Sequence, residues 1–240
     1  MNVYETCKIG DLIHDNPYVG RGIVIGKSLD GKKAAFAYFI MGRSENSRNR
    51  VFIPTEDGIR TEAYDPSKVV DPSLIIYSPV RKAGSSVIVT NGDQTDTIYD
   101  YVNQGKTFEE ALDTREFEPD GPNFTPRISG ILFYNGSDFT YKLNILKSAD
   151  SEGSACNRFT FSYSPTDGVG HFLHTYITDG NPIPTFCGEP ERVVIPDDID
   201  ELTNDLWENL NDANKISLYV CYTDLETKEV ETRLINKYNR

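Results

Sequence analysis

Residues 34–41 read AAFAYFIM, and residues 22–26 shortly before them read GIVIG. Both stretches are rich in β-branched or aromatic side chains and have the length of a strand, and glycine stands at both ends of the shorter one and directly after the longer one, which is typical of strands buried in a sheet. Runs of this kind recur along the whole chain. We therefore predict about ten strands, at residues 22–26, 34–41, 74–77, 86–90, 128–134, 139–146, 159–163, 171–177, 216–222 and 230–235.

Helical patterns are few. Residues 199–210 repeat an apolar side chain every three or four positions, with acidic residues between them, which predicts an amphipathic helix. Two shorter helices are expected at residues 94–104 and at residues 107–115, where Thr107 and Glu110 fit a capping box. Asn-Gly at 135–136 predicts a hairpin. Many strands, few helices and no long linker indicate one α+β domain over residues 1–240, with helices covering the sheets.

The composition is acidic. The chain has 24 Lys and Arg against 37 Asp and Glu, a net charge of −13 over 240 residues. A general nucleic-acid-binding protein needs a basic surface, so this class is excluded. The charge is unevenly spread, because residues 197–212 hold seven acidic and no basic side chains, whereas residues 1–60 hold nine basic and seven acidic ones. A local basic pocket can therefore still bind one small anion.

Neither the cysteines nor the histidines indicate a metal site. The four cysteines are far apart and form no CxxC pair, which predicts free thiols in a reducing cytoplasm. His171 and His174 would point to opposite faces of a strand, so we expect no metal and no other cofactor. The first residues do not resemble a signal peptide, and no stretch of 18 apolar residues predicts a membrane span.

Two polar turns follow predicted strands. Residues 42–50 present, among Ser and Asn side chains, the arginines Arg43, Arg48 and Arg50. Arginine binds phosphate through paired hydrogen bonds, although a solvated turn has the same composition. Residues 91–96 (NGDQTD) lie between a strand and a helix, where free backbone N–H groups often bind anions. The alternative there is an Asx turn in which Asp93 caps the helix.

Two further segments hold groups suited to proton transfer. Residues 116–128 place carboxylates, prolines and an arginine at the entrance of a strand. General acid–base chemistry requires a carboxylate held in this way, but a stiff surface loop is equally compatible with the composition. Residues 168–176 (GVGHFLHTY) carry two histidines, of which one is expected to face a pocket.

The order of these segments carries more information than any one of them. The pieces are NPYVGRG at 16–22, Arg43-Ser44 through Asn49-Arg50, NGDQTD at 91–96, and EPD at 118–120 with TPRI at 125–128. Together they resemble the archaeal-type IMP cyclohydrolase family and its bacterial relatives. GHFLHTY at 170–176 and GEP at 188–190 are similar to the bacterial branch.

The resemblance implies an Ntn-hydrolase-like fold, a four-layer αββα sandwich with two mainly antiparallel sheets. It also implies an activity without cofactors: ring closure of 5-formamidoimidazole-4-carboxamide ribonucleotide, with loss of water, to give IMP in purine biosynthesis. The expected partners are this purine ribonucleotide and its product, with no nucleic acid and no membrane. The family further suggests a homo-oligomer.

The family implies an arginine, a tyrosine and a glutamate at the reacting centre. We assign these catalytic roles to Arg43, Tyr77 and Glu118, with Arg48 and Arg50 as alternatives for the arginine because this segment is longer than the archaeal pattern. A core position is an equally fair interpretation of Tyr77. The expected substrate-binding residues are Arg21, Ser44, Asn46, Arg48, Arg50, Asn91, Asp93, Thr125, Arg127 and His174.

Two other functions are compatible with the same residues. An amide hydrolase of the Ntn class uses an N-terminal Cys, Ser or Thr as its nucleophile. This chain begins Met1-Asn2, so cleavage before Thr6 or Cys7 would be required. A non-catalytic purine-nucleotide-binding protein would keep the arginines without converting the substrate.

Overall fold

The computed structural model describes residues 4–69 and 76–238, in which the strands form two sheets. The six-stranded sheet has the order β11-β10-β1-β2-β12-β13, and the seven-stranded sheet has the order β3-β4-β5-β6-β7-β8-β9. The first contains β1 (Arg21–Lys27), β2 (Lys33–Met41), β10 (Val169–His174), β11 (Glu191–Val194), β12 (Lys215–Asp224) and β13 (Val230–Asn236). The second contains β3 (Arg50–Pro54), β4 (Gly58–Ala63), β5 (Val80–Ala83), β6 (Ser86–Thr90), β7 (Arg127–Asn135), β8 (Asp138–Ser148) and β9 (Cys156–Tyr163).

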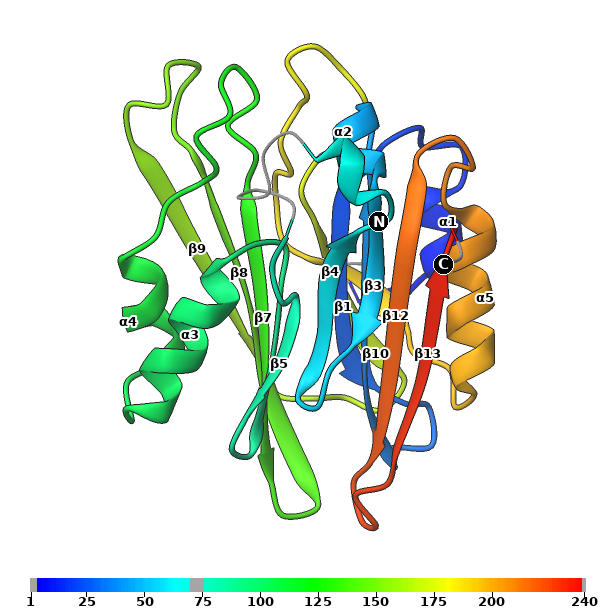
Figure 1. The fold of residues 1–240 in the computed structure, drawn as a ribbon. Coiled ribbons are helices and arrows are strands. Elements are labelled where there is room, and N and C mark those ends of the chain that lie inside the picture. The colour runs from blue at the N-terminus through cyan, green and yellow to red at the C-terminus, as the bar shows by residue number, and fades with distance from the viewer. Residues whose placement is uncertain (1–3, 70–75, 239–240) are drawn as a thin grey trace.

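Helices cover the outer face of each sheet (Figure 1). The helices α1 (Ile9–Ile13) and α5 (Ile199–Asn209) pack on the six-stranded sheet, and α3 (Gln94–Asn103) and α4 (Phe108–Asp113) pack on the seven-stranded sheet. The short α2 (Glu45–Arg48) and η1 (Pro66–Lys68) lie in connections between strands. The strand pairings are antiparallel. The expected α+β sandwich with two antiparallel sheets is confirmed, and its kinship with Ntn hydrolases stays a prediction.

Three cores fill the spaces between these layers, and strand alternation separates them. In β2, Phe39 and Met41 belong to the core under α1 and α5, whereas Phe36, Tyr38 and Ile40 belong to the core between the sheets. Successive side chains of a strand point to opposite faces, so one buried strand supplies both cores. A third core lies between α3, α4 and the seven-stranded sheet. The unbroken apolar run at 34–41 follows from this burial on both faces.

Most predicted elements are confirmed, with small shifts at their ends. Nine of the ten expected strands and all three expected helices coincide with elements of the structure, and Asn135 and Asp138 pair across the expected hairpin. The prediction of a strand at 74–77 is wrong for the two residues that the structure describes, Ile76 and Tyr77. Residues 74 and 75 lie outside the described residues, and Ile76 and Tyr77 belong to no strand. The prediction lacked β3, β4, β5 and β11, which are only four to six residues long.

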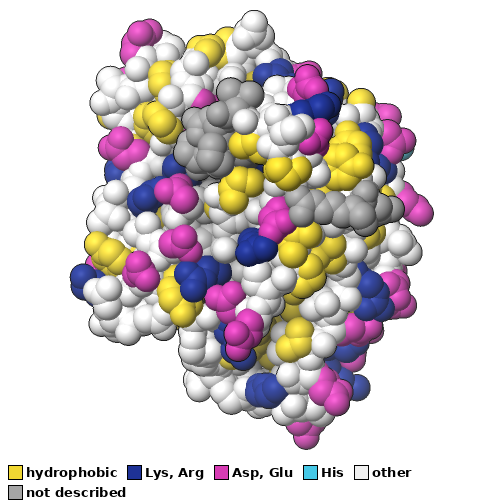
Figure 2. Space-filling model, viewed as in Figure 1, with side chains coloured by type: hydrophobic (Ala, Val, Ile, Leu, Met, Phe, Trp, Pro, Cys, Tyr) yellow, Lys and Arg dark blue, Asp and Glu magenta, His cyan; other side chains and the backbone are white. Residues whose placement is uncertain are grey.

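The surface, the cysteines, the helices and the possible metal ligands complete the description of the fold. On the face shown in Figure 2, hydrophobic side chains reach the surface in the middle of the view, with acidic and basic side chains around them. Cys7, Cys156, Cys187 and Cys221 are free thiols, as predicted. Within residues 4–69 and 76–238, no helix has the length and hydropathy needed to cross a membrane, and no group of three or more His, Cys, Asp or Glu is arranged to hold a metal ion.

Candidate active site

Alternation along three strands brings polar side chains to one end of the layer between the sheets. In β1, Arg21 lies on the same face as Ile23, which belongs to the inter-sheet core. Tyr38 of β2 belongs to the same core. In β3, Arg50 lies two residues before Phe52, whose ring stacks on Tyr38 with centroids 5.7 Å apart. Side chains from both sheets therefore meet in one buried space.

Arg21 and Arg50 are buried in that space with unused hydrogen-bond donors. Arg50 is 0% exposed, and its Nε donates to the carbonyl of Ser47 at 2.8 Å. Its Nη1 and Nη2, and the Nε of Arg21, find no acceptor among the described residues. A buried donor without an acceptor costs about 1–3 kcal/mol, so it needs a specific reason. Two guanidinium groups in this condition are suited to an anionic or carbonyl-rich ligand.

Tyr77 joins the two arginines from the loop before β5. Its backbone is fixed on β4, because Thr61 N donates to the Tyr77 carbonyl at 2.8 Å and Tyr77 N donates to Thr61 Oγ1 at 2.9 Å. The hydroxyl of Tyr77 lies 2.8 Å from that of Tyr38, and both side chains are buried. The two phenols form a hydrogen-bonded pair that links the six-stranded sheet to the other side of the site.

Glu118 supplies a carboxyl group to the same cluster. It lies in the loop before β7, where its backbone N–H donates to the carbonyl of Thr125 at 2.9 Å, and only 4% of the residue is exposed. Burial raises the pKa of Glu118, although the charges of Arg21 and Arg127 oppose this shift. A raised pKa makes a carboxyl group bind its proton more tightly than an ordinary glutamate does, which favours a role in general acid–base chemistry.

The charges in the cluster act on one another. Burial lowers the pKa of Arg50, and the positive charge of Arg21 lowers it further. Burial also tends to lower the pKa of Arg21, but the nearby Tyr18, Glu118 and Tyr77 outweigh it and raise that pKa. Arg21, Arg50, Tyr77 and Glu118 are called the arginine cluster below. The pKa values of Arg21, Arg50 and Glu118 are shifted from their ordinary values. Several buried groups with shifted pKa values in one place are typical of a functional site.

Aromatic side chains and the loop of Glu118 enclose the cluster. The rings of Tyr18 and Tyr176 stack with centroids 5.7 Å apart. The hydroxyl of Tyr176 lies 2.6 Å from Thr125 Oγ1, and Thr125 N donates to Asp120 Oδ1 at 2.6 Å. These contacts tie the loop that carries Glu118 to the chain leaving β10, so the carboxyl group is held in a defined position.

Comparison with known proteins assigns the chain to a family. Residues 18–229 match the family described as IMP cyclohydrolase-like protein. The chain belongs to this family. It is 29% identical to the IMP cyclohydrolase of Methanococcus aeolicus over 164 residues, which are 66% of this chain and 74% of the relative. The IMP cyclohydrolase of Methanopyrus kandleri is 32% identical over 57% of this chain and 72% of its own length. That of Halobacterium salinarum is 31% identical over 51% of this chain and 60% of its own length.

The resemblance to the IMP cyclohydrolase family suggested Arg43, Tyr77 and Glu118 as the reacting set. Tyr77 and Glu118 lie in the arginine cluster, but Arg43 lies at its edge. The Arg43 guanidinium forms an ion pair with Asp179 and donates to the carbonyl of Gly180 at 2.8 Å. It also stands 5.3 Å from the ring centroid of Tyr18. Of the arginines that remained open, Arg50 is the one close enough to Tyr77 and Glu118 for their charges to interact.

A second group of polar side chains is bonded within the protein and consists of Arg127, Asp93 and Asn91. Arg127 Nη1 donates to Gln94 Oε1 at 2.8 Å and pairs with Asp93 Oδ1 at 2.6 Å. Burial tends to raise the pKa of Asp93, but Arg115 and Arg127 lower it overall. Asn91 is also fully engaged, because its Nδ2 donates to the Pro126 carbonyl and its Oδ1 accepts from Ile128 N and Gln94 Nε2. These groups have their hydrogen bonds within the protein and hold the start of β7 in place.

The remaining predicted binding residues are spread around the site. Ser44 caps α2 through reciprocal hydrogen bonds with Ser47. Arg48 donates to the carbonyl of Gly42 at 3.0 Å and to Asn214 Oδ1 at 2.8 Å. The Oδ1 of Asn46 is buried and has no partner among the described residues.

His174 lies in the six-stranded sheet and holds two segments of the backbone together. Its Nδ1 lies 2.7 Å from the carbonyl of Tyr176, and its Nε2 lies 3.2 Å from Glu191 Oε2. Its ring stacks on Phe172 with centroids 4.7 Å apart. The histidine therefore supports the wall near Tyr176, and none of its contacts found among residues 4–69 and 76–238 is with the arginine cluster.

Tyr38, Tyr18 and Tyr176 are part of the site and were absent from the sequence prediction. Tyr38 and Tyr176 lay within predicted strands, where a core role is the ordinary expectation. A usable signal exists for Tyr38, since it alternates in phase with Phe36 and Ile40 on one face of β2. Alternation alone does not tell which partner that face meets.

Proposed function

We propose that this chain is an IMP cyclohydrolase that closes the ring of 5-formamidoimidazole-4-carboxamide ribonucleotide to give IMP. The observation that carries the proposal is the arginine cluster, in which unpaired guanidinium donors, a tyrosine hydroxyl and a buried carboxyl group share one space. Membership of the IMP cyclohydrolase-like family supports the same chemistry. The proposed partners are the purine ribonucleotide substrate and its product.

The reaction makes and breaks a small set of bonds. The carboxamide nitrogen forms a bond to the formyl carbon, and negative charge develops on the formyl oxygen. That oxygen then leaves as water, taking one proton from the carboxamide nitrogen and one from the formamido nitrogen. The enzyme has to align the two groups, stabilise the oxygen and move two protons. Alignment can contribute on the order of 7 kcal/mol, and an aimed donor about 3–4 kcal/mol.

Each of these tasks has a candidate in the cluster. Tyr77 donates to the formyl oxygen, and Tyr38 orients the Tyr77 hydroxyl across their 2.8 Å contact. Arg50 and Arg21 stabilise the charge on that oxygen with their unpaired donors. Glu118 moves the protons, because its raised pKa makes the carboxylate a stronger base than an ordinary glutamate. Arg48 and Arg127 are engaged by the protein and act as positioning residues.

A cyclisation assay with paired variants tests the proposal. The purified chain is incubated with the formamido substrate, and IMP formation is followed by absorbance. Glu118→Gln should lower turnover by about a hundredfold, because it removes the proton carrier. Glu116→Gln is the matched control, since Glu116 is exposed in the same loop. Equal turnover in the two variants would remove Glu118 from the mechanism.

Two other activities are distinguished by simple measurements. An amide hydrolase would need a mature chain starting at Thr6 or Cys7, which intact mass would reveal. Cys7 is paired with Val193 beside β11, and burial raises the pKa of its thiol, so its surroundings do not favour a nucleophile. A non-catalytic binder would bind IMP in calorimetry without forming it. We further propose that the enzyme works in the cytoplasm and that it is a homo-oligomer. Light scattering on the purified protein would test the oligomeric state.

A further inference from the structure

A cavity of about 590 Å³ lies between the sheets, at the end opposite the arginine cluster. Strands lead from one site to the other: β3 runs from Arg50 toward Thr55 at the cavity, and β7 runs from Arg127 to Tyr134 in its wall. Seven residues of extended strand span roughly 20 Å, so the cavity is a separate site. Its volume is in the range of pockets that bind small organic molecules.

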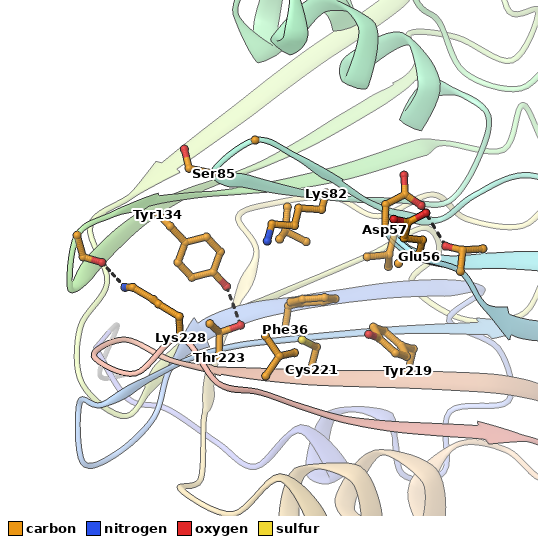
Figure 3. Close-up of a pocket in the computed structure, with 17 residues that line it drawn as sticks. Phe36, Glu56, Asp57, Lys82, Ser85, Tyr134, Tyr219, Cys221, Thr223 and Lys228 are labelled. Carbon is orange, nitrogen blue, oxygen red and sulfur yellow. Dashed lines mark hydrogen bonds between the residues drawn. The ribbon is translucent and has the colours of Figure 1, made fainter.

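Both sheets contribute apolar walls to this cavity (Figure 3). Phe36, Tyr219 and Cys221 come from the six-stranded sheet, and the rings of Phe36 and Tyr219 are 5.9 Å apart. Tyr134 and Val87 come from the other sheet. Burial raises the pKa of both Tyr134 and Cys221 to about 12, so these walls are uncharged at neutral pH. Aromatic walls of this kind suit a flat apolar ligand.

One positive charge is directed into the space. Figure 3 shows the ammonium group of Lys82 pointing toward the gap between Tyr134 and Phe36. The ion pairs found in residues 4–69 and 76–238 include none with Lys82. A single unpaired ammonium beside apolar walls complements a single anionic group.

Two of the other charged groups at the rim, Asp57 and Lys228, are bonded to neighbouring groups. Asp57 accepts hydrogen bonds from Thr55 Oγ1 and from Arg81 Nε at 3.0 Å. Lys228 donates to the carbonyls of Gly136 and Leu225. Glu56 also lines the cavity and, like Lys82, is exposed to solvent. Because Lys228 is bonded to two carbonyls, Lys82 is the available positive charge for a ligand.

We propose that this cavity binds a small aromatic molecule that carries one carboxylate or sulfonate group, with the ring between the apolar walls and the anion on Lys82. The proposal does not rest on the cyclohydrolase activity. A second copy of the chain could instead cover the apolar walls, and the experiment below separates the two occupants.

The probe is 8-anilinonaphthalene-1-sulfonate, an aromatic sulfonate whose fluorescence rises in apolar surroundings. The full chain should bind it saturably, with one molecule per chain and the same affinity in the presence of saturating IMP. Lys82→Gln should weaken this binding about tenfold, because a charge-assisted hydrogen bond is lost. Lys32→Gln, a change of an exposed lysine outside the cavity, should leave it unchanged. The uncharged probe N-phenyl-1-naphthylamine should bind the native chain and Lys82→Gln equally.

A second variant fills the space without changing the charge. Val87→Trp should abolish binding of both probes, while circular dichroism shows a folded chain. Unsaturable binding, or equal affinity of the native chain and the Lys82→Gln variant, would overturn the proposal. If sedimentation shows an oligomer that Val87→Trp or Lys82→Gln dissociates, the second copy occupies the cavity and the small-molecule site is wrong. Turnover by Lys82→Gln is measured separately, so that failure of the cavity and failure of the cyclohydrolase assignment are told apart.

Discussion

Glu118 is a carboxyl group in a place where its charge is unfavourable. Burial raises its pKa, so the folded chain binds the proton more tightly than the unfolded chain does. Ionised Glu118 therefore costs stability, and this cost appears as the pH rises above the ordinary value of 4.5. We predict that Glu118→Gln raises the free energy of unfolding at pH 7.5 and has little effect at pH 4, measured by urea denaturation. A variant that is less stable at pH 7.5 would contradict this account, and Glu116→Gln controls for the loop.

Tyr38 acts on the reaction through Tyr77. We predict that Tyr38→Phe lowers kcat about tenfold with little change in KM, because the Tyr77 hydroxyl loses its partner at 2.8 Å and its orientation. Tyr222→Phe is a matched control, since it removes a buried hydroxyl that donates to the Pro196 carbonyl at 2.8 Å on the other side of the sheet. The control should cost about 1 kcal/mol of stability and leave kcat unchanged. Equal effects of both variants on kcat would show that Tyr38 is only structural.

The choice between the arginines shows how far single residues can be predicted. The arginines of the segment 43–50 were recognised as a group because their chemistry is explicit in the sequence. Selecting Arg50 requires knowing that it opens β3 and lies on the same face as Phe52, whose ring stacks on Tyr38. β3 is five residues long and was not predicted, so this information was beyond local patterns. The roles of Asn91 and Arg127 depend likewise on partners that only the fold brings together.

At the scale of elements, one hydrogen bond links the two sheets near β10. His171 Nδ1 lies 2.6 Å from the Tyr141 hydroxyl of β8, and the His171 ring stacks on Tyr163 with centroids 3.7 Å apart. Burial, together with the charge of Arg192, lowers the pKa of His171 from 6.5 to about 4. Between these values the unfolded chain binds a proton that the folded chain does not, so stability falls as the pH falls through this window.

We predict that the free energy of unfolding decreases by about 2 kcal/mol through His171 between pH 6.5 and pH 4, after allowance for solvent screening. His171→Gln should flatten this part of the pH profile, whatever its effect at pH 7. His14→Gln should retain the slope, because His14 is exposed. The measurement is urea denaturation in half-unit pH steps. A His171→Gln profile parallel to that of the native chain would disprove the assignment.

Elements were predictable where one local pattern dominates. Residues 199–209 form α5 because their apolar stripe and acidic face fit a helix on a sheet. The apolar run at 74–77 has the composition of a strand, yet the Tyr77 backbone is held in a loop by hydrogen bonds with the backbone N–H and the side-chain hydroxyl of Thr61. The residue pairing that fixes it lies 16 positions away. Tertiary contacts of this kind override local preference.

For the whole molecule, the position of charge matters more than its sum of −13. Part of the acidic stretch after residue 196 is paired, since Asp200 contacts Arg233 and Asp212 contacts Lys215. Arg21 and Arg50 are instead enclosed between the sheets with unused donors. The acidic exterior disfavours long polyanions, while the enclosed arginines act on one small ligand at short range.

The most direct test of the central claim is IMP formation by the native chain beside an Arg50→Met variant. Arg50→Met removes the guanidinium whose Nη1 and Nη2 are unpaired, and Arg43→Met is the control at the edge of the site. The account predicts that the native chain converts the formamido substrate to IMP, that Arg50→Met reduces kcat at least a hundredfold, and that Arg43→Met retains a much larger share of kcat. No IMP from the folded native chain, or full turnover by Arg50→Met, would contradict it.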